Sequence, residues 1–171
     1  MATTKMIQSH MVIPFINRGT DSNPNWVQIK KTVDWNMSFN AETEDRKYIS
    51  DRYATTEVLR YKPSVPISLT TINGEDDFTV FDGMRKKLPT GDDAKTQLLL
   101  VRLEDVDEYT EGTDYPATLA NVTVVIDSED TVNSTLSVTL NFNGTPTEGT
   151  ASFEDGVPSF TEAAGSNVTE P

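Results

Sequence analysis

The spacing of apolar residues limits the fold of this chain more than any other feature. Residues 135–142 alternate strictly, with Leu136, Val138 and Leu140 separated by single polar residues. A period of two is typical of a half-buried β-strand with one face in water. Residues 32–39 repeat the pattern, and their apolar members are Val33, Trp35, Met37 and Phe39. Shorter apolar runs predict further strands at residues 58–61, 65–72, 97–106 and 116–127.

One segment, residues 76–88, favours a helix instead. Its apolar residues recur at steps of three or four, which places them on one helical face. The residues expected to pack the helix are Phe78, Phe81, Met84 and Leu88. Acidic residues open the segment and basic residues close it, which complements the helix dipole. A helix this short is marginal alone in water, so it must lie on an apolar surface.

These elements predict a mainly β fold, a β-sandwich or partly closed barrel with the helix covering one open edge or end. The length of 171 residues favours a single domain. Its core is expected at residues 26–143, interrupted by a long inter-strand loop at residues 40–56. Residues 1–25 lack a sustained period and predict an extended N-terminal arm. Residues 144–171 predict a C-terminal arm, a small hairpin followed by a tail.

The inter-strand loop combines charges of both signs with Tyr48 and Tyr53. It is longer than the usual hairpin loop, and loops of this length tend to be functional or disordered. One interpretation is a solvated loop. The other is a docking loop that orders against a partner, because mixed charges with embedded aromatic residues suit an interface.

Charge is distributed unevenly along the chain. The net charge is −13, yet all 14 Lys and Arg lie at or before Arg102. Residues 1–102 therefore carry +1, and residues 103–171 carry −14. Surplus acid keeps a protein dispersed, and it also suits a face that repels a polyanion or meets a more basic face of another copy. Sequence-specific nucleic-acid binding is disfavoured, because it needs clustered Lys and Arg.

The sequence offers little catalytic chemistry. It has no cysteine, and His10 is its single histidine, so neither a thiol site nor a Ser-His-Asp set can be assembled. It contains no phosphate-binding loop and no dinucleotide fingerprint. Asp127, Glu129 and Asp130 form an acidic turn that lacks the EF-hand spacing. We therefore expect no enzyme, no cofactor and no metal site, and neither a signal peptide nor a membrane span.

Several phrases, in their order, resemble the major tail proteins of phages with long non-contractile tails, particularly those of Gram-positive hosts. The first phrase is NPNWVQIKKTVDWNMSFNAETEDRKYISD, which follows the arm. The second runs from VPISLTTI through DDFTVFDGMRKKLPTGDDAKTQLLLVRLED and is similar to the family's strand–helix–strand centre. The third is GTPTEGTASFEDGVPSFTE, in which GVPSF stands where the family has Gly-x-Pro-x-Phe in its closing hairpin.

The resemblance implies the tail tube fold and a structural role in the virion. Subunits of that family form hexameric rings whose inner sheets join into one continuous β-barrel, and the rings stack into a hollow tube. A tape measure protein occupies the lumen first, and phage dsDNA later passes through it without sequence-specific binding. The expected partners are therefore other copies of the chain, the tape measure protein, and the tail terminator and distal tail proteins. The expected location is the tail tube, assembled in the host cytoplasm.

The family places a ring-to-ring loop after its first alternating strand, where this chain has residues 40–56. The residues expected to stack rings are Glu42, Glu44, Asp45, Arg46, Lys47, Tyr48 and Arg52. Mixed charges there would set the register between rings more than the affinity. The polar side of residues 32–39 supplies the lumen candidates Asp34, Asn36 and Ser38, since large barrels line their channels with such faces.

Two other functions stay open at the level of sequence. A β-sandwich binding module, such as a capsid decoration or receptor-binding domain, would need a local aromatic or calcium-bearing site. The inner tube protein of a contractile tail would share the fold and differ in having a sheath as partner.

Overall fold

The computed structural model describes residues 6–165, which are mainly β with one α-helix. In chain order the strands are β1 (Val12–Asn17), β2 (Trp26–Gln28), β3 (Ala41–Arg46), β4 (Thr55–Tyr61), β5 (Ser64–Thr70), β6 (Lys95–Arg102), β7 (Tyr115–Asp130), β8 (Thr135–Glu154) and β9 (Val157–Glu162). The helix is α1 (Asp76–Lys87), and the short 3-10 turns are η1 (Ser9–Met11) and η2 (Gly91–Ala94). The outer ends of the two predicted arms, residues 1–5 and 166–171, lie outside the described residues.

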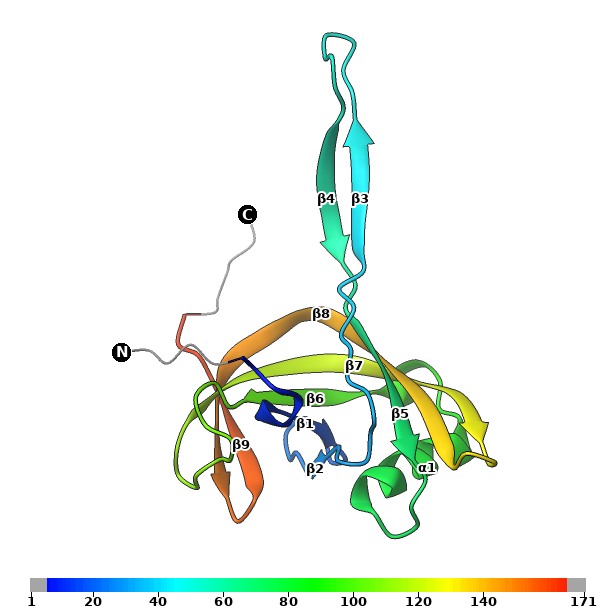
Figure 1. Cartoon of the computed structure of the whole chain (residues 1–171), viewed down its shortest axis with the longest axis vertical. Coiled ribbons are helices and arrows are strands. Elements are labelled where there is room, and N and C mark those ends of the chain that lie inside the picture. The colour runs from blue at the N-terminus through cyan, green and yellow to red at the C-terminus, as the bar shows by residue number, and fades with distance from the viewer. Residues whose placement is uncertain (1–5, 166–171) are drawn as a thin grey trace.

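Antiparallel pairing joins most of the strands into one curled sheet (Figure 1). The strand order is β2-β1-β6-β7-β8-β5, and β9 pairs with the second half of β8. Beyond β2 the chain returns to β5, where isolated bridges join Thr32 to Leu69 and Ser38 to Ser64. These bridges bring the two ends of the sheet together, so its path of six strands forms a nearly closed barrel. The prediction of a mainly β, partly closed barrel with one helix is confirmed.

Two clusters of buried side chains lie on opposite faces of the sheet. Strand β6 contributes to both, with Leu98 and Leu100 in the first core and Leu99 and Val101 in the second. A strand buried on both faces has a continuous apolar run instead of alternation, as its sequence LLLV does. The first core lies inside the barrel against α1. The second lies between β1, β6 and the end of β8 that pairs with β9.

The helix packs on the first core through most of its predicted face. Phe81 is fully buried, and Phe78 and Met84 are half-buried against the same core. The prediction for Leu88 is wrong, because it caps the helix in the left-handed conformation with φ 47° and is 64% exposed. The chain turns outward at that residue, so the next side chain in the period points to solvent. Val80, which lies one position before Phe81, is buried in its place.

Residues 32–39 are extended but do not form the regular strand that their alternation predicts. Apart from the bridges at Thr32 and Ser38, and a hydrogen bond from the Lys62 N–H to the Phe39 carbonyl, their backbone pairs with no strand within residues 6–165, and Val33 is 83% exposed. The side chain of Asp34 explains why the strand is interrupted. The carboxylate of Asp34 accepts the backbone N–H of Ser68 at 3.0 Å, which a carbonyl would accept in a continuous ladder.

The N-terminal arm is shorter than predicted. Strand β1 lies between β2 and β6, and Met11 and Ile16 beside and within it are fully buried. Residues 18–25 form the turn that leads to β2, held by the buried side chain of Asn17, which accepts the N–H groups of Gly19 and Asn25. The sequence of β1 shows no alternation of apolar and polar residues because both faces of the strand are covered.

The predicted core boundary at residue 143 is also not a boundary, because β8 continues through it to Glu154. Leu140 faces the first core and Ala151 faces the second, so β8 passes from one core to the other. Its register with β7 shifts between these residues, which exchanges the buried side and breaks the alternation there. The small hairpin predicted at residues 150–160 is present, and its turn residues Asp155 and Gly156 have φ 50° and 77°, as a primed turn requires.

Candidate assembly surfaces

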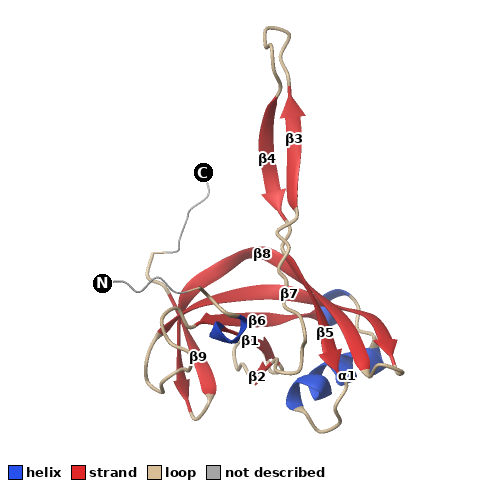
Figure 2. Cartoon of the chain, in the orientation of Figure 1, coloured by secondary structure: helices blue, strands red, loops and turns tan. Residues whose placement is uncertain are grey.

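The predicted inter-strand loop is a long hairpin that projects away from the barrel (Figure 2). Strands β3 and β4 pair only with each other, as a separate two-stranded sheet. Every residue of the two strands except Glu42 is exposed. The predicted strand at residues 58–61 is the second half of β4, whereas residues 41–46 have almost no apolar residues, so their sequence does not reveal β3.

One face of the hairpin carries a ladder of ion pairs. Arg46 lies 3.0 Å from Glu44 and 3.9 Å from Glu57, and Glu42 bonds to Arg60. The hydrogen bond from Arg60 lowers the pKa of Glu42, and Glu42 raises the pKa of Arg60. Three of the predicted stacking residues, Glu42, Glu44 and Arg46, are therefore engaged in ion pairs within one chain, along β3 and across to β4.

The remaining predicted stacking residues lie on the other face or at the tip. Asp45 accepts a hydrogen bond from the hydroxyl of Thr56 at 2.6 Å. Lys47, Tyr48 and Arg52 lie in the turn between the strands, where the guanidinium of Arg52 is 5.7 Å from the ring centroid of Tyr53.

The hairpin also exposes a set of large apolar side chains that sequence reasoning did not select. Ile49 is fully exposed at the tip, and Tyr53 is 75% exposed. The full set is Phe39, Tyr48, Ile49, Tyr53, Val58, Leu59 and Tyr61. A lone two-stranded hairpin is marginal in water, and clustered apolar side chains on a surface mark an interaction site. The hairpin is the first candidate assembly surface.

Two open edges of the sheet form the second candidate surface. On the side away from β5, residues 33–37 bond to no other backbone within residues 6–165. The second open edge belongs to β7, which pairs with β6 only up to Thr123, opposite Lys95. Beyond that pair, residues 124–130 form strand pairs only with β8 within residues 6–165. Exposed backbone donors and acceptors of this kind are templates for pairing with another chain.

Between these edges the sheet presents a polar face. Pairing places Ser68 beside Ser137 and Ser64 beside Asn141, on the side opposite the first core. The lumen candidate Ser38 exchanges backbone hydrogen bonds with Ser64 and so lies at the border of this face. Asn36, two residues earlier, is exposed. Asp34 is exposed as well and binds β5 as described above.

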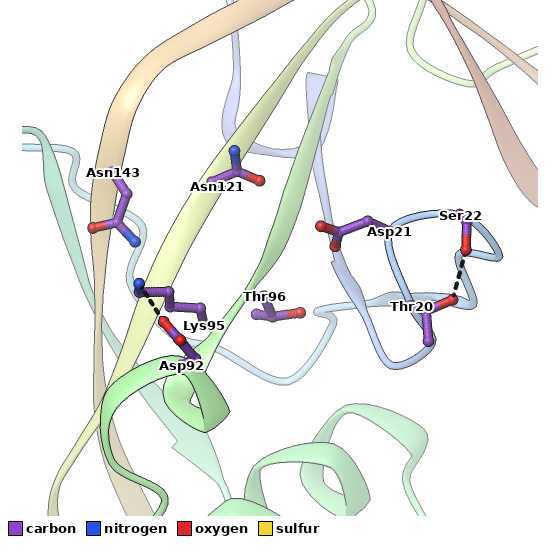
Figure 3. Close-up of a pocket in the computed structure, with 8 residues that line it drawn as sticks. All are labelled: Thr20, Asp21, Ser22, Asp92, Lys95, Thr96, Asn121 and Asn143. Carbon is purple, nitrogen blue, oxygen red and sulfur yellow. Dashed lines mark hydrogen bonds and ion pairs between the residues drawn. The ribbon is translucent and has the colours of Figure 1, made fainter.

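A polar hollow of about 910 Å³ adjoins this face (Figure 3). It is lined by Thr20, Asp21, Ser22, Asp92, Lys95, Thr96, Asn121 and Asn143. Lys95 bonds to Asp92 at 2.6 Å and lowers the pKa of that carboxyl. The lining joins hydroxyls and amides to one closed ion pair and offers no nucleophile with a base beside it.

Within residues 6–165, no three His, Cys, Asp or Glu side chains are close enough together to hold a metal ion. The described part of the chain also contains no helix that is long and apolar enough to span a membrane.

No protein-family model and no curated protein matches this sequence. Several solved structures resemble the fold, among them two tube-terminating proteins. One is the sheath/tube terminator of PVC, an extracellular contractile injection system, in the extended state: the TM-score is 0.53 at 11% identity, over 86% of this chain and 99% of that chain. The other is the tube-terminating cap of AFP, the anti-feeding prophage: the TM-score is 0.53 at 13% identity, over 88% of this chain and 95% of that chain. The chain therefore shares its fold with tube-terminating proteins of these two injection machines.

Proposed function

We propose that this chain is a structural subunit of a phage-type tail tube. Copies associate side by side into hexameric rings, and the rings stack into a hollow tube that conducts dsDNA. The observation that carries the proposal is the β3–β4 hairpin, an exposed and apolar projection on an otherwise self-contained barrel. The shared fold with tube-terminating proteins supports it.

Ring formation uses the two open edges. Residues 33–37 of one copy pair with residues 124–130 of the next, which extends one layer of sheet from copy to copy. Such a contact joins two different surfaces, and contacts of this type close into a ring when the rotation between copies is right. Pairing also removes the open edges that make a free subunit prone to aggregation.

Stacking uses the hairpin. Its ion pairs stiffen the two strands, and its apolar side chains, with Ile49 and Tyr53 at the tip, supply the contact with the next ring. Tyrosine is enriched among residues that dominate binding energy at interfaces. Lys47 and Arg52 at the tip remain available to set the register, which keeps part of the original prediction for residues 40–56.

The polar face then lines the lumen, with Asn36 and Ser38 at its border. Along β8 this face presents Thr135, Ser137, Thr139 and Asn141, and β7 adds two acidic residues, Asp127, which accepts a hydrogen bond from Thr139, and Asp130 opposite Thr135. Hydroxyls and amides hydrate well and offer DNA no cationic partner, so phosphate passes without being held. The tape measure protein would occupy the same lumen before DNA, and the terminator and distal tail proteins would close the tube.

A second candidate is the terminator itself, because the PVC and AFP structures that share the fold are terminating proteins. A terminator forms a ring that ends a tube and does not stack on further copies of itself. A contractile-tail inner tube is a third possibility, in which a sheath surrounds the same rings.

Electron microscopy of the purified protein at rising concentration separates these functions. A tube protein gives rings and then hollow stacks. A terminator gives single rings at every concentration. Dispersed monomers at every concentration would refute the proposal and favour a binding module.

The hairpin is tested by replacing Tyr48, Ile49 and Tyr53 with Ser. We expect rings to form as before and the concentration at which they stack to rise about tenfold or more, since apolar contacts at the centre of an interface dominate its energy. Val132→Ser is the matched control, because Val132 is 89% exposed in the turn between β7 and β8 and lies outside the hairpin. Normal stacking of the triple variant would contradict the role of the tip.

A further inference from the structure

A basic groove lies between α1 and the turn that follows β1. It measures about 720 Å³, and its cationic residues are Arg18, Lys87 and Lys95. Lys95 bonds to Asp92, whereas Arg18 and Lys87 form no ion pair within residues 6–165. Gly83 lines the groove with open space beside its Cα, so the helix leaves room there for an incoming segment. Asp93 is the acidic residue of the lining.

An acidic loop lies at the other end of the subunit (Figure 1). Residues 104–114 connect β6 to β7, and every one of them is exposed. Their acidic residues are Glu104, Asp105, Asp107, Glu108, Glu111 and Asp114, and the loop contains no Lys or Arg. The groove and the loop are therefore opposite in charge and cannot meet within one chain.

The groove flanks one open edge of the sheet. Lys95 pairs with Thr123, the last β7 residue before the open stretch. Arg85 of α1 lies 3.2 Å from Glu129 within that stretch. The helix and its groove therefore accompany the β7 edge.

The acidic loop flanks the other open edge. His10 lines one hollow together with residues 32–35, and it lines a second hollow together with Asp107, Glu108 and Tyr109. Its imidazole Nε2 is 3.3 Å from the carboxylate of Asp107. The loop thus lies on the same flank as residues 32–38.

We propose that the acidic loop of one copy docks in the basic groove of the next copy around the ring. This inference rests on the proposed side-by-side assembly, because pairing the two open edges brings these oppositely charged surfaces to the same interface. It also gives a role to the uneven charge of the chain, in which no cation follows Arg102. Opposite charges on the two flanks steer copies into head-to-tail contact and disfavour contacts between like flanks.

A zero-length carbodiimide crosslink on the unaltered protein tests the contact directly. The reagent joins a carboxylate to an amine as an amide, so it couples Lys87 or Lys95 to an acidic residue of the loop only when they touch. We expect such crosslinks between copies in the ring fraction and their loss at high salt. Rings whose crosslinks all lie elsewhere would overturn the inference and leave the proposed function standing.

Charge reversal supplies an independent measurement. Arg18→Glu with Lys87→Glu reverses the groove, and Glu108→Lys with Glu111→Lys reverses the loop. Each reversal alone should raise the ring-forming concentration about tenfold, and the chain carrying both should recover, because opposite charges again face each other. Glu162→Lys is the matched control, because Glu162 is exposed and pairs with Gly149 at the end of β9 that lies away from the β8–β9 turn. Thermal unfolding of each variant checks that it folds.

The outcomes separate the two proposals. If the unaltered protein forms no rings, the proposed function fails and this inference with it. If rings form and the combined reversal does not recover, the docking of loop into groove is wrong while ring formation remains.

Discussion

Asp77 closes a corner of the barrel, and its removal is the sharpest test of the fold described above. Its side chain is 2% exposed, and one carboxylate oxygen accepts the backbone N–H groups of Lys30 and Lys31, each at 2.9 Å. The other oxygen accepts the N–H of Phe78 at 2.8 Å. The chain leaves β2 here and crosses to β5, so these N–H groups have no strand opposite them. The Asp77 carboxylate supplies the hydrogen-bond acceptors that a neighbouring strand would otherwise provide.

The expected loss in the free energy of unfolding follows from the backbone N–H donors that lose their acceptor. Asp77→Ala removes the acceptor from three partly buried N–H groups, those of Lys30, Lys31 and Phe78, and each unsatisfied buried donor costs about 1–3 kcal/mol, with partial exposure placing these at the low end. We expect a loss of about 3 kcal/mol in the free energy of unfolding. For a chain of 171 residues that corresponds to a fall in Tm of about 6–12 °C. Residues 30–38, which the corner holds against β5, should exchange their amide hydrogens faster.

Asp76→Ala is the matched control, because Asp76 is exposed in the same first turn of α1. It removes a charge that favours the helix dipole, worth about 0.3–1 kcal/mol. Differential scanning calorimetry and hydrogen exchange of both variants make the comparison. Equal values of Tm for the two variants would refute the role assigned to Asp77.

Two further predictions concern the helix and the hairpin. Phe81→Ala should lower the free energy of unfolding by about 3–5 kcal/mol in urea titrations, because Phe81 is buried. Leu88→Ala should lower it by no more than about 0.5 kcal/mol, because Leu88 is exposed. Similar losses in the two variants would contradict the packing of α1. The pKa of Glu42 is held below its ordinary value of 4.5 by Arg60, so its ion pairs stabilise the hairpin above that value and are lost as the pH falls through the lowered pKa. The protection factor of the Val58 amide, which divides out the intrinsic pH dependence of exchange, should fall over that range in the original chain and stay constant in Glu42→Gln. Parallel profiles would exclude the ladder as the cause.

The sequence by itself determined the local elements and their buried sides. The period of two at residues 135–142 indicates that Leu136, Val138 and Leu140 face a core, and they do. The period of the helix likewise selects Phe81. These features depend on neighbours in the chain, which is why spacing alone reveals them.

The tertiary structure decided what faces each element, and this depends on residues far apart in sequence. Residues 32–39 alternate like a strand, but they have only β5 beside them and Asp34 interrupts the ladder. The charges of residues 40–56 suggest a solvated loop, but pairing with β4 turns them into a projecting hairpin. Strand β8 changes its buried side where it passes between two cores. A sequence period records which side of a segment avoids water, whereas the partner on that side is set by chain topology.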